Sequence, residues 1–457
     1  MKKDPGTRRI TVVGAGLAGS EAAWQLCRRG IPVTLIEMRP HRTTPAHRTG
    51  GFAELVCSNS LGAFEITSPG GILKAELDMM GSLILDCARR SRVPAGKALA
   101  VDRDSFSECI TGALASDPLV AVERKEIHEI PEGPAIIATG PLTSDPLARS
   151  LSRTVGENFL SFFDAVSPVV TAESIDMTRA FRGGRWGFGD DYINCPMNRE
   201  EYEAFHAALV SAERAPRHDF EKDDRYFEGC LPVEVIASRG VDTLRFGPLR
   251  PVGLSDPISG EEPWAVVQLR QENTSGTLYN LVGFQTNLRW PEQESVFRMI
   301  PALSGAEFVR LGVMHRNIYV DAPKVLDPFL RLKVQSDIFL AGQITGVEGY
   351  VESTAMGLVA ALNTAALVSG QEFPVWPRET AVGSLLAHLS DPQPRSFQPM
   401  NTNLGIFPPL LQRIKKRPER CGKYASRSSE SMKKFIEELP PLLRKIPTIQ
   451  ISSENYD

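Results

Sequence analysis

Two cysteines have sequence neighbours that suit a reactive thiol. Cys230 lies in "YFEGCLPVEVIASRG", between a glycine and an apolar–proline step, and Cys57 lies in "ELVCSNS". A thiolate is a strong nucleophile and an acceptable leaving group, so an accessible cysteine can form a covalent bond and later release it. A free cysteine can equally serve as a small buried apolar residue. The small and polar neighbours favour accessible thiols, with the buried structural role as the alternative.

The full set of seven cysteines argues against a disulfide or zinc framework. The number is odd, the spacing is wide, and no CxxC pair occurs among positions 27, 57, 87, 109, 195, 230 and 421. Disulfide frameworks and structural zinc sites use clustered and usually even sets of cysteines. We therefore expect free thiols and no metal site, with the cysteines other than 57 and 230 in packing or surface roles.

The composition is that of a protein with a large buried core. The chain has 457 residues, 42% hydrophobic and 23% charged, enough for two or three domains. No apolar run reaches the about 18 residues of a membrane span, and the basic start "MKKDPGTRR" leads directly into a strand pattern. We therefore expect no membrane contact, no export signal and a cytoplasmic location.

The charge is unevenly distributed. A net charge of −4 argues against a general polyanion binder, yet residues 413–445 carry 11 Lys and Arg against 4 Glu. Both a solvated helix face and a phosphate-binding surface fit this stretch.

The first forty residues predict a dinucleotide-binding unit. An apolar strand at residues 10–13 runs into glycines in GxGxxG spacing, then a helix at residues 20–29 and a second strand at residues 32–37. The three glycines form the turn, admit a pyrophosphate to the helix N-terminus, and let helix and strand pack closely. Glu37 ends the second strand, where a carboxylate can accept hydrogen bonds from ribose hydroxyls.

Two later segments favour FAD over NAD as the dinucleotide. "AIIATG" (residues 135–140) is a strand that runs into a turn of small residues, and residues 337–365 form a strand, a glycine-rich turn and a long helix of small residues. The N-terminus of such a helix can approach a flavin ring and stabilise negative charge on it. The predicted cofactor-binding residues are Gly14, Ala15, Gly16, Leu17, Ala18, Gly19, Glu37, Gly342 and Gln343.

These patterns predict an α/β fold with an interrupted dinucleotide domain. We expect a Rossmann-like FAD-binding domain of the two-dinucleotide-fold type in residues 1–165, which resumes at residues 310–372. Short strand-like runs broken by Gly, Pro and Asn in residues 166–309 predict an inserted α+β substrate domain. Residues 373–457 predict a helical extension with the basic stretch.

Longer motifs carry a resemblance to a known family. The chain resembles the folate- and FAD-dependent tRNA (uracil-5-)-methyltransferases, in collinear order from residue 9 to about residue 411, through "TPAHRT", "FAELVCSNSLG", "VPAGKALAVDR", "YINCPM", "FEGCLPVEVIASRG", "LRFGPLRPVGL", "VVQLRQEN", "NLVGFQTNL", "GVMHRNIYV" and "AGQITGVEGYVES". The resemblance implies a bacterial enzyme that methylates C5 of uridine 54 in the tRNA T-loop. It implies 5,10-methylenetetrahydrofolate as the one-carbon donor and flavin electrons supplied by NADH or NADPH.

The resemblance also implies roles for single residues. Cys230 would add to C6 of the uracil and Cys57 would take the C5 proton, and which cysteine does which stays open. His315 and Arg316 in "GVMHRNIYV" would bind folate. One departure is visible: the family tends to have a basic residue in a tract like "RYGKG", and this chain has "RWGFG", with Phe188 at that place.

Other functions remain possible on the sequence alone. The same chemistry could act on a ribosomal RNA uridine, and the fold could serve an FAD-dependent NAD(P)H oxidoreductase that never contacts RNA. A protein that binds RNA and keeps flavin only as structure is a further alternative. A related flavoprotein that modifies uridine 34 of tRNA is usually longer, and this chain is expected to be too short for it. The oligomeric state is not predicted.

Overall fold

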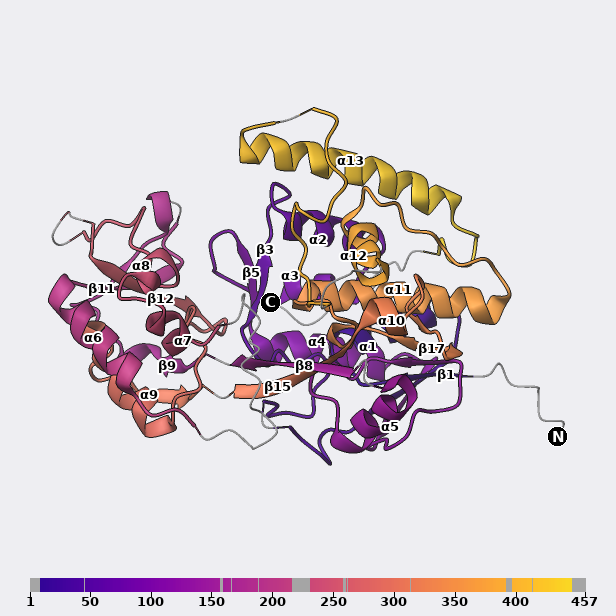
Figure 1. Ribbon diagram of the computed structural model, residues 1–457, viewed down its shortest axis with the longest axis horizontal. Helices are drawn as coiled ribbons and strands as arrows, with labels where there is room; N and C mark the ends of the chain where they lie inside the picture. The colour runs from indigo at the N-terminus through magenta and orange to yellow at the C-terminus, as the bar shows by residue number, and fades with distance from the viewer. Residues whose placement is uncertain are drawn as a thin grey trace.

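The computed structural model describes residues 9–44, 46–156, 159–165, 167–187, 189–215, 231–257, 260, 262–312, 314–391, 397–412 and 414–445. Figure 1 shows two lobes: a larger one around a parallel sheet, and a smaller one that contains helices α6 to α9. The long helix α13 crosses the top of the larger lobe.

The larger lobe is built on a six-stranded sheet with the order β16-β17-β7-β1-β2-β6, and all neighbouring pairs except β16–β17 are parallel. Its strands are β1 (Ile10–Val13), β2 (Val33–Glu37), β6 (Val120–Arg124), β7 (Ala135–Ile137), β16 (Arg331–Leu332) and β17 (Gln335–Leu340). The central strands β7, β1 and β2 are mostly apolar and largely buried, as expected for parallel strands covered on both faces. The two strands that the first glycine motif predicts are confirmed, and so is the α/β fold class.

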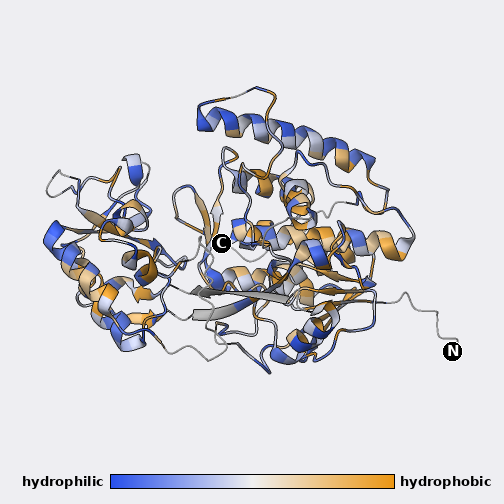
Figure 2. Ribbon diagram, viewed as in Figure 1, coloured by the Kyte–Doolittle hydropathy of each residue, from blue (hydrophilic) through white to orange (hydrophobic). Residues whose placement is uncertain are grey.

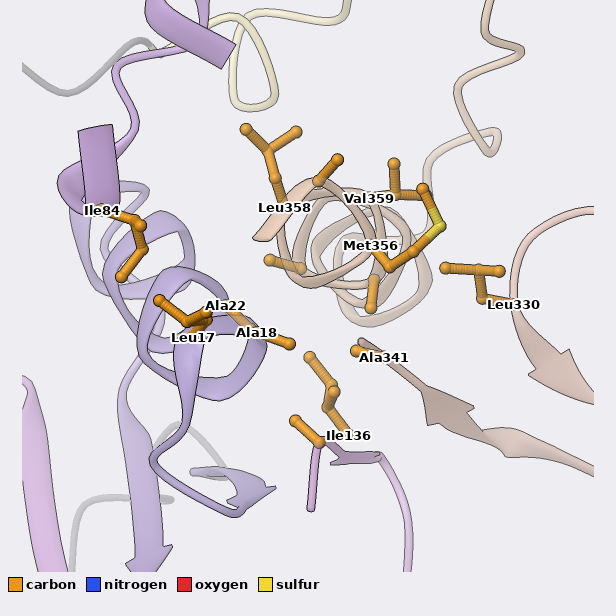
Figure 3. Close-up of a cluster of buried hydrophobic side chains, with 14 of the residues drawn as sticks. Leu17, Ala18, Ala22, Ile84, Ile136, Leu330, Ala341, Met356, Leu358 and Val359 are labelled. Atoms are coloured by element: carbon orange, nitrogen blue, oxygen red, sulfur yellow. The ribbon is translucent and has the colours of Figure 1, made fainter. Parts of the chain in front are cut away.

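Helices α1 (Leu17–Arg28) and α11 (Tyr350–Ser369) pack directly on each other beside this sheet. Figure 3 shows Ala18 of α1 pointing toward α11 and Ala341. The approach requires a residue without a side chain, since a Cβ on Gly357 would lie 2.2 Å from the carbonyl oxygen of Ala18. Among the described helices, α11 alone is long and apolar enough to cross a membrane, but 89% of its apolar window is buried inside the protein.

Further elements surround this core. They are α2 (Pro69–Met79), α3 (Leu83–Arg90), α4 (Arg103–Ala115), α5 (Asp145–Val155), α10 (Ala322–Val325), α12 (Ala381–Ser390), α13 (Arg417–Glu438), and a three-stranded sheet β3-β5-β4 (Ser60–Ala63, Ala98–Val101, Arg92–Val93). Figure 2 shows that the outward side of α13 is strongly hydrophilic. The helix packs on the core through its apolar residues, among them Tyr424, Met432 and Phe435.

The smaller lobe, residues 167–312, is called the inserted segment below. Its sheet has the order β10-β11-β12-β13-β9-β14 and is antiparallel. The strands are β9 (Val169–Thr171), β10 (Phe181–Arg182), β11 (Tyr192–Met197), β12 (Ala265–Gln271), β13 (Leu278–Leu281) and β14 (Phe308–Arg310), and the helices are α6 (Arg199–Ser211), α7 (Val233–Ser238), α8 (Thr243–Phe246) and α9 (Trp290–Phe297). The segment has its own apolar core.

An antiparallel ribbon joins the two lobes. It pairs β8 (Phe159–Ala165), along which the chain leaves the larger lobe, with β15 (Met314–Val320), along which it returns. The two connections therefore lie side by side, which limits how the inserted segment can be displaced.

The expectation that all cysteines are free thiols is wrong for one pair. Cys87 of α3 and Cys109 of α4 form a disulfide, with their Cα atoms 5.8 Å apart. Their separation of 22 residues in the sequence gave no sign of this pairing, which arises because α3 and α4 pack side by side. Cys27, Cys195 and Cys421 are buried free thiols, which agrees with packing roles.

Candidate active site

Two glycines of the GxGxxG motif pack against backbone atoms, and the third faces open space. A Cβ on Gly19 would lie 1.7 Å from the carbonyl oxygen of Gly14, and a Cβ on Gly14, whose φ is +94°, would lie 2.6 Å from the carbonyl oxygen of Ala138. A Cβ on Gly16 would meet no atom within 4 Å. The space in front of Gly16, at the N-terminus of α1, is therefore available to a ligand.

Glu37 is buried beside this turn. Its carboxylate accepts hydrogen bonds from the backbone N–H of Ala15 at 2.8 Å and from Nε of Arg39 at 2.9 Å. Burial would raise the pKa of Glu37, but the hydrogen bonds and charge of Arg39 outweigh it and hold the pKa below its usual value. Glu37 is therefore a fixed negative charge at the end of β2.

A cavity opens at the carboxyl ends of the parallel strands. It has about 550 Å³ of empty space, part of it open to solvent, and is lined by Gly14, Gly16, Glu37, Arg39 and, from the following turns, Lys125, Glu126, Ala138 and Thr139. Ligands of open α/β sheets bind at this edge. An open glycine turn, a buried carboxylate and nearby cations are what a dinucleotide requires, so the residues present fit FAD.

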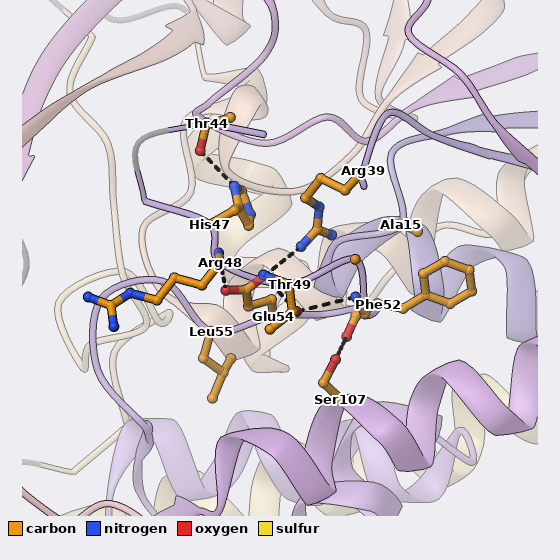
Figure 4. A network of polar contacts seen from close by, with 12 residues as sticks. Ala15, Arg39, Thr44, His47, Arg48, Thr49, Phe52, Glu54, Leu55 and Ser107 are labelled. Atoms are coloured by element: carbon orange, nitrogen blue, oxygen red, sulfur yellow. Dashed lines mark hydrogen bonds and ion pairs between the residues drawn. The ribbon is translucent and has the colours of Figure 1, made fainter. Parts of the chain in front are cut away.

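The segment after β2 is held in place by Arg39. The guanidinium of Arg39 is 2% exposed and also donates to Glu54 at 2.9 Å. Glu54 in turn accepts from the backbone N–H groups of Arg48 and Thr49, as Figure 4 shows. This network fixes the chain that leads into the loop of Cys57.

Cys57 lies at the junction of the two lobes and is half-buried. Its backbone N–H donates to Oη of Tyr350 at 2.8 Å, and its carbonyl oxygen accepts from Nη2 of Arg103 at 3.2 Å. Tyr350 is the first residue of α11, and Arg103 is the first residue of α4. Both hydrogen-bond partners of the Cys57 backbone are therefore the first residues of helices in the larger lobe.

Three arginines surround this loop. Arg103 forms an ion pair with Glu272 of the inserted segment, and Arg310 donates to the carbonyl oxygen of Val56. Nε of Arg270 donates to Oδ1 of Asn59 at 2.9 Å. Burial and the positive charge of Arg103 lower the pKa of Arg310 to about 10. The loop therefore lies in a positively charged junction that both lobes build.

After the chain returns to the larger lobe along β15, the second predicted cofactor motif lies beside the start of α1. Gly342 has φ +83°, and a Cβ there would lie 2.8 Å from Cβ of Ala18 in α1. Gln343 donates through Nε2 to Glu348 at 2.6 Å. Gly342 thus has a packing role, and the Gln343 amide lies in the turn that precedes α11.

Two residues singled out from the sequence lie outside the described part of the chain. They are Cys230 and Phe188. For His315 and Arg316 only the backbone is described, in β15, where they pair with Asp164 and Phe163 of β8. No group of three or more metal-binding side chains occurs among the described residues.

The residues that follow Cys230 are firmly anchored. Val233 donates its N–H to the carbonyl oxygen of Gln285 at 2.7 Å. The buried carboxylate of Glu234 accepts from Oγ1 of Thr286 and from the N–H of Asn287, both at 2.9 Å. Burial raises the pKa of Glu234. Glu234 therefore secures the start of α7, four residues after Cys230 in the sequence.

Tyr350, Arg103 and Glu272 carry no signal in the sequence that predicts a place in the site. Tyr350 and Arg103 fall within quoted motifs, "AGQITGVEGYVES" and "VPAGKALAVDR", but nothing in the motifs indicates that both residues contact the loop of Cys57. Only the fold brings these distant positions together.

Sequence comparison identifies close relatives along almost the whole chain. The chain is 60% identical over 432 residues to the methylenetetrahydrofolate--tRNA-(uracil-5-)-methyltransferase TrmFO of Desulforudis audaxviator, covering 94% of this chain and 98% of that protein. The chain belongs to the TrmFO family. The TrmFO protein of Listeria monocytogenes is 52% identical over 433 residues, 94% of this chain and 100% of that protein.

A family model and a solved structure extend the comparison. The family model described as glucose inhibited division protein A matches residues 9–372, which include the cavity, Cys57 and the inserted segment. The solved structure of Aquifex aeolicus GidA superimposes with a TM-score of 0.67 at 15% identity, over 96% of this chain and 75% of that chain. This likeness confirms the Rossmann-type fold of the TrmFO chain.

Proposed function

We propose that this protein methylates C5 of a uridine in tRNA, uridine 54 of the T-loop, in the cytoplasm. The one-carbon unit comes from 5,10-methylenetetrahydrofolate, the bound cofactor is FAD, and NADH or NADPH supplies the electrons. The relatives' names support the reaction. The observation that carries the proposal is the position of Cys57, a half-buried thiol between the lobe that fits a dinucleotide and the inserted segment.

The chemistry explains why thiols are needed. C5 of uracil is a weak nucleophile until a group adds to C6 and pushes negative charge onto C5. A thiolate can make that bond and later leave by elimination. We assign the addition to Cys230 and the removal of the C5 proton to Cys57. Tyr350 and Arg103 hold the backbone of Cys57 on both sides, so they orient the thiol without reacting themselves.

The remaining residues bind and orient the cofactor and folate. When bound, FAD would supply the electrons that reduce the one-carbon unit to a methyl group. The open space at Gly16 suits its pyrophosphate, and Glu37 suits a ribose. Gly342 and Gln343 precede α11, whose N-terminal dipole favours negative charge. His315 and Arg316 are assigned to folate.

The test is methyl transfer from labelled folate. Purified protein is incubated with an unmodified tRNA transcript, NADH or NADPH, and carbon-labelled 5,10-methylenetetrahydrofolate, without S-adenosylmethionine. Label at C5 of the T-loop uridine is expected with the wild-type protein, and none with Cys230→Ala or Cys57→Ala. Cys195→Ala, which removes a buried thiol, serves as the matched control.

Other results would point to other functions. Label in ribosomal RNA but not in tRNA would keep the chemistry and change the substrate. Flavin reduction by NADH with no label in either RNA, and with turnover unaffected by Cys230→Ala, would favour an oxidoreductase that does not act on RNA.

A further inference from the structure

Trp186 is a large aromatic residue held on the surface in an unusual backbone conformation. Its φ and ψ are 62° and 26°, and the residue is 68% exposed. A bulky side chain rarely adopts positive φ, and such strain persists only where the surroundings impose it. An exposed tryptophan gains little from burial, so packing of the ring does not account for this conformation.

The neighbouring loop imposes the conformation. The N–H of Trp186 donates to the carbonyl oxygen of Gly253 at 2.7 Å, and Nη1 of Arg185 donates to the carbonyl oxygen of Val252 at 2.8 Å. A Cβ on Gly253, whose φ is +85°, would lie 2.8 Å from Cε2 of the Trp186 ring. The ring therefore lies against bare backbone on one side, and its position is fixed although most of the residue is exposed.

Two cations accompany the ring. Arg185 precedes Trp186 in the chain and Arg250 lies three residues before Gly253, and burial and the positive charge of Arg250 lower the pKa of Arg185. The hydrogen bonds of Arg185 go to neutral acceptors, the Val252 carbonyl and Oε1 of Gln268. Within the part of the chain that the structure describes, neither arginine has a carboxylate within ion-pair distance. Asp191, nearby in sequence, accepts instead from the N–H of Gly96 at 2.5 Å.

A short path connects this surface to the junction of Cys57. Arg185 contacts Gln268 of β12 at 3.1 Å, and Arg270, two residues further along the same face of β12, contacts Asn59. Alternate residues on one face of a strand are about 7 Å apart. Asn59 follows Cys57 by two residues. The Trp186 surface and the candidate active site therefore lie along one face of the same strand.

We propose that Trp186, Arg185 and Arg250 form a contact surface for RNA, in which an unpaired base stacks on the indole and the arginines bind the flanking phosphates. This inference rests on the proposed function, because it takes the RNA to be the substrate. Proteins that read unpaired RNA use exposed aromatic rings as stacking platforms and arginines for the backbone. An indole fixed in place loses little conformational freedom when a base stacks on it.

The test measures the affinity of the full-length protein for an unmodified tRNA transcript. Trp186→Ala should weaken binding by about 5- to 150-fold, the range that one stacked base contributes. Trp186→Phe should retain most of the affinity. Trp290→Ala is the matched control, since Trp290 is 61% exposed on α9 of the same segment, and it should bind like the wild type. Arg250→Gln should weaken binding and reduce the salt slope by about 1.

The outcomes separate this inference from the proposed function. Wild-type affinity in Trp186→Ala, with thermal unfolding unchanged, would overturn the inference alone. Equal losses in Trp186→Ala and Trp290→Ala would also overturn it, because the effect would then not be specific to this surface. A wild-type protein that binds neither tRNA nor ribosomal RNA would overturn the proposed function and this inference together.

Discussion

The backbone N–H of Cys57 donates to the hydroxyl of Tyr350 at 2.8 Å, across 293 residues of sequence. The N–H of Ser58 points at the same hydroxyl at 3.3 Å. Tyr350 begins helix α11, which packs on α1, so the loop of Cys57 is tied to a helix that contacts the glycine-motif helix. The position of the Cys57 thiol thus depends on the start of α11 as much as on the loop that contains Cys57.

Replacing Tyr350 by Phe should impair methyl transfer while leaving flavin reduction intact. The change leaves the N–H groups of Cys57 and Ser58 without their acceptor, at a cost of about 1–3 kcal/mol for each group that stays unsatisfied. The loop should shift, and with it the thiol. Labelled methyl formation and the rate of flavin reduction by NADH are measured side by side.

Tyr202→Phe is the control for this change, because the Tyr202 hydroxyl also contacts backbone, but as a donor to the carbonyl oxygen of Val241 inside the inserted segment. It should lower stability without changing methyl formation per folded molecule. Normal methyl formation by Tyr350→Phe would show that the hydroxyl does not position Cys57.

The sequence predicted the dinucleotide fold well because the glycine motif is local. Gly14, Gly16 and Gly19 act within one turn, and their spacing alone implies a strand before and a helix after. The junction around Cys57 could not be predicted in the same way. Its partners Tyr350 and Arg103 lie in different segments, and an isolated arginine or tyrosine gives no sign of the backbone oxygen or N–H that it contacts.

Gly16 and Gly19 should respond differently to substitution. Gly16→Ala should fold normally, because its Cβ would meet no atom within 4 Å, but should bind FAD more weakly because the methyl group occupies the space for the pyrophosphate. Gly19→Ala should not fold stably, since its Cβ would lie 1.7 Å from the carbonyl oxygen of Gly14. Thermal unfolding of the flavin-free proteins and FAD titration distinguish the two effects. Full FAD affinity in Gly16→Ala would place the pyrophosphate elsewhere.

The ion pair between Arg103 and Glu272 should contribute strongly to stability because both groups are largely buried. Glu272→Gln leaves a buried guanidinium without its counter-charge, which should destabilise the protein by about 3–5 kcal/mol. Glu294→Gln breaks an exposed pair with Arg298 and should cost at most about 1 kcal/mol. Denaturant unfolding of both variants provides the comparison, and a similarly small loss in both would mean that water or a nearby group compensates Arg103.

Glu76 should make the attachment of the C-terminal helices sensitive to pH. Its buried carboxyl accepts from the N–H groups of Ala381 and Val382 at the start of α12, and from Oγ of Ser428 in α13. Burial raises the pKa of Glu76 to about 7, against about 4.5 when exposed, and the hydrogen bonds offset this only in part. The native state therefore holds the proton more tightly than the unfolded state.

The sign of the pH effect follows from that difference. The stabilisation is fully present below about pH 4.5 and is lost as the pH rises through about 7, and it amounts to roughly 3 kcal/mol. Glu76→Gln cannot titrate, so between pH 5 and 8 its free energy of unfolding should fall less than that of the wild type. Glu430→Gln, at an exposed position on α13, should follow the wild type. Parallel curves for wild type and Glu76→Gln would show that Glu76 stays ionised in the native state.

The two ends of α13 should contribute differently to RNA affinity. Lys415, Lys416 and Arg417 are exposed at its N-terminal end, which in Figure 1 is the end directed toward the inserted segment. Lys433 and Lys434 are exposed near its other end. If RNA lies over the junction of the lobes, only the first group can reach its phosphates.

Glutamine substitution of these two groups tests that geometry. Loss of Lys415, Lys416 and Arg417 should weaken tRNA binding and reduce the slope of log affinity against log salt by about 0.7 to 0.9 for each phosphate contact removed. Loss of Lys433 and Lys434 should change neither quantity by as much, because charges far from the RNA are screened within about 10 Å at ordinary ionic strength. Equal effects of the two sets would mean that α13 acts only through the net charge of the protein, and no effect of either would mean that its outer face is simply solvated.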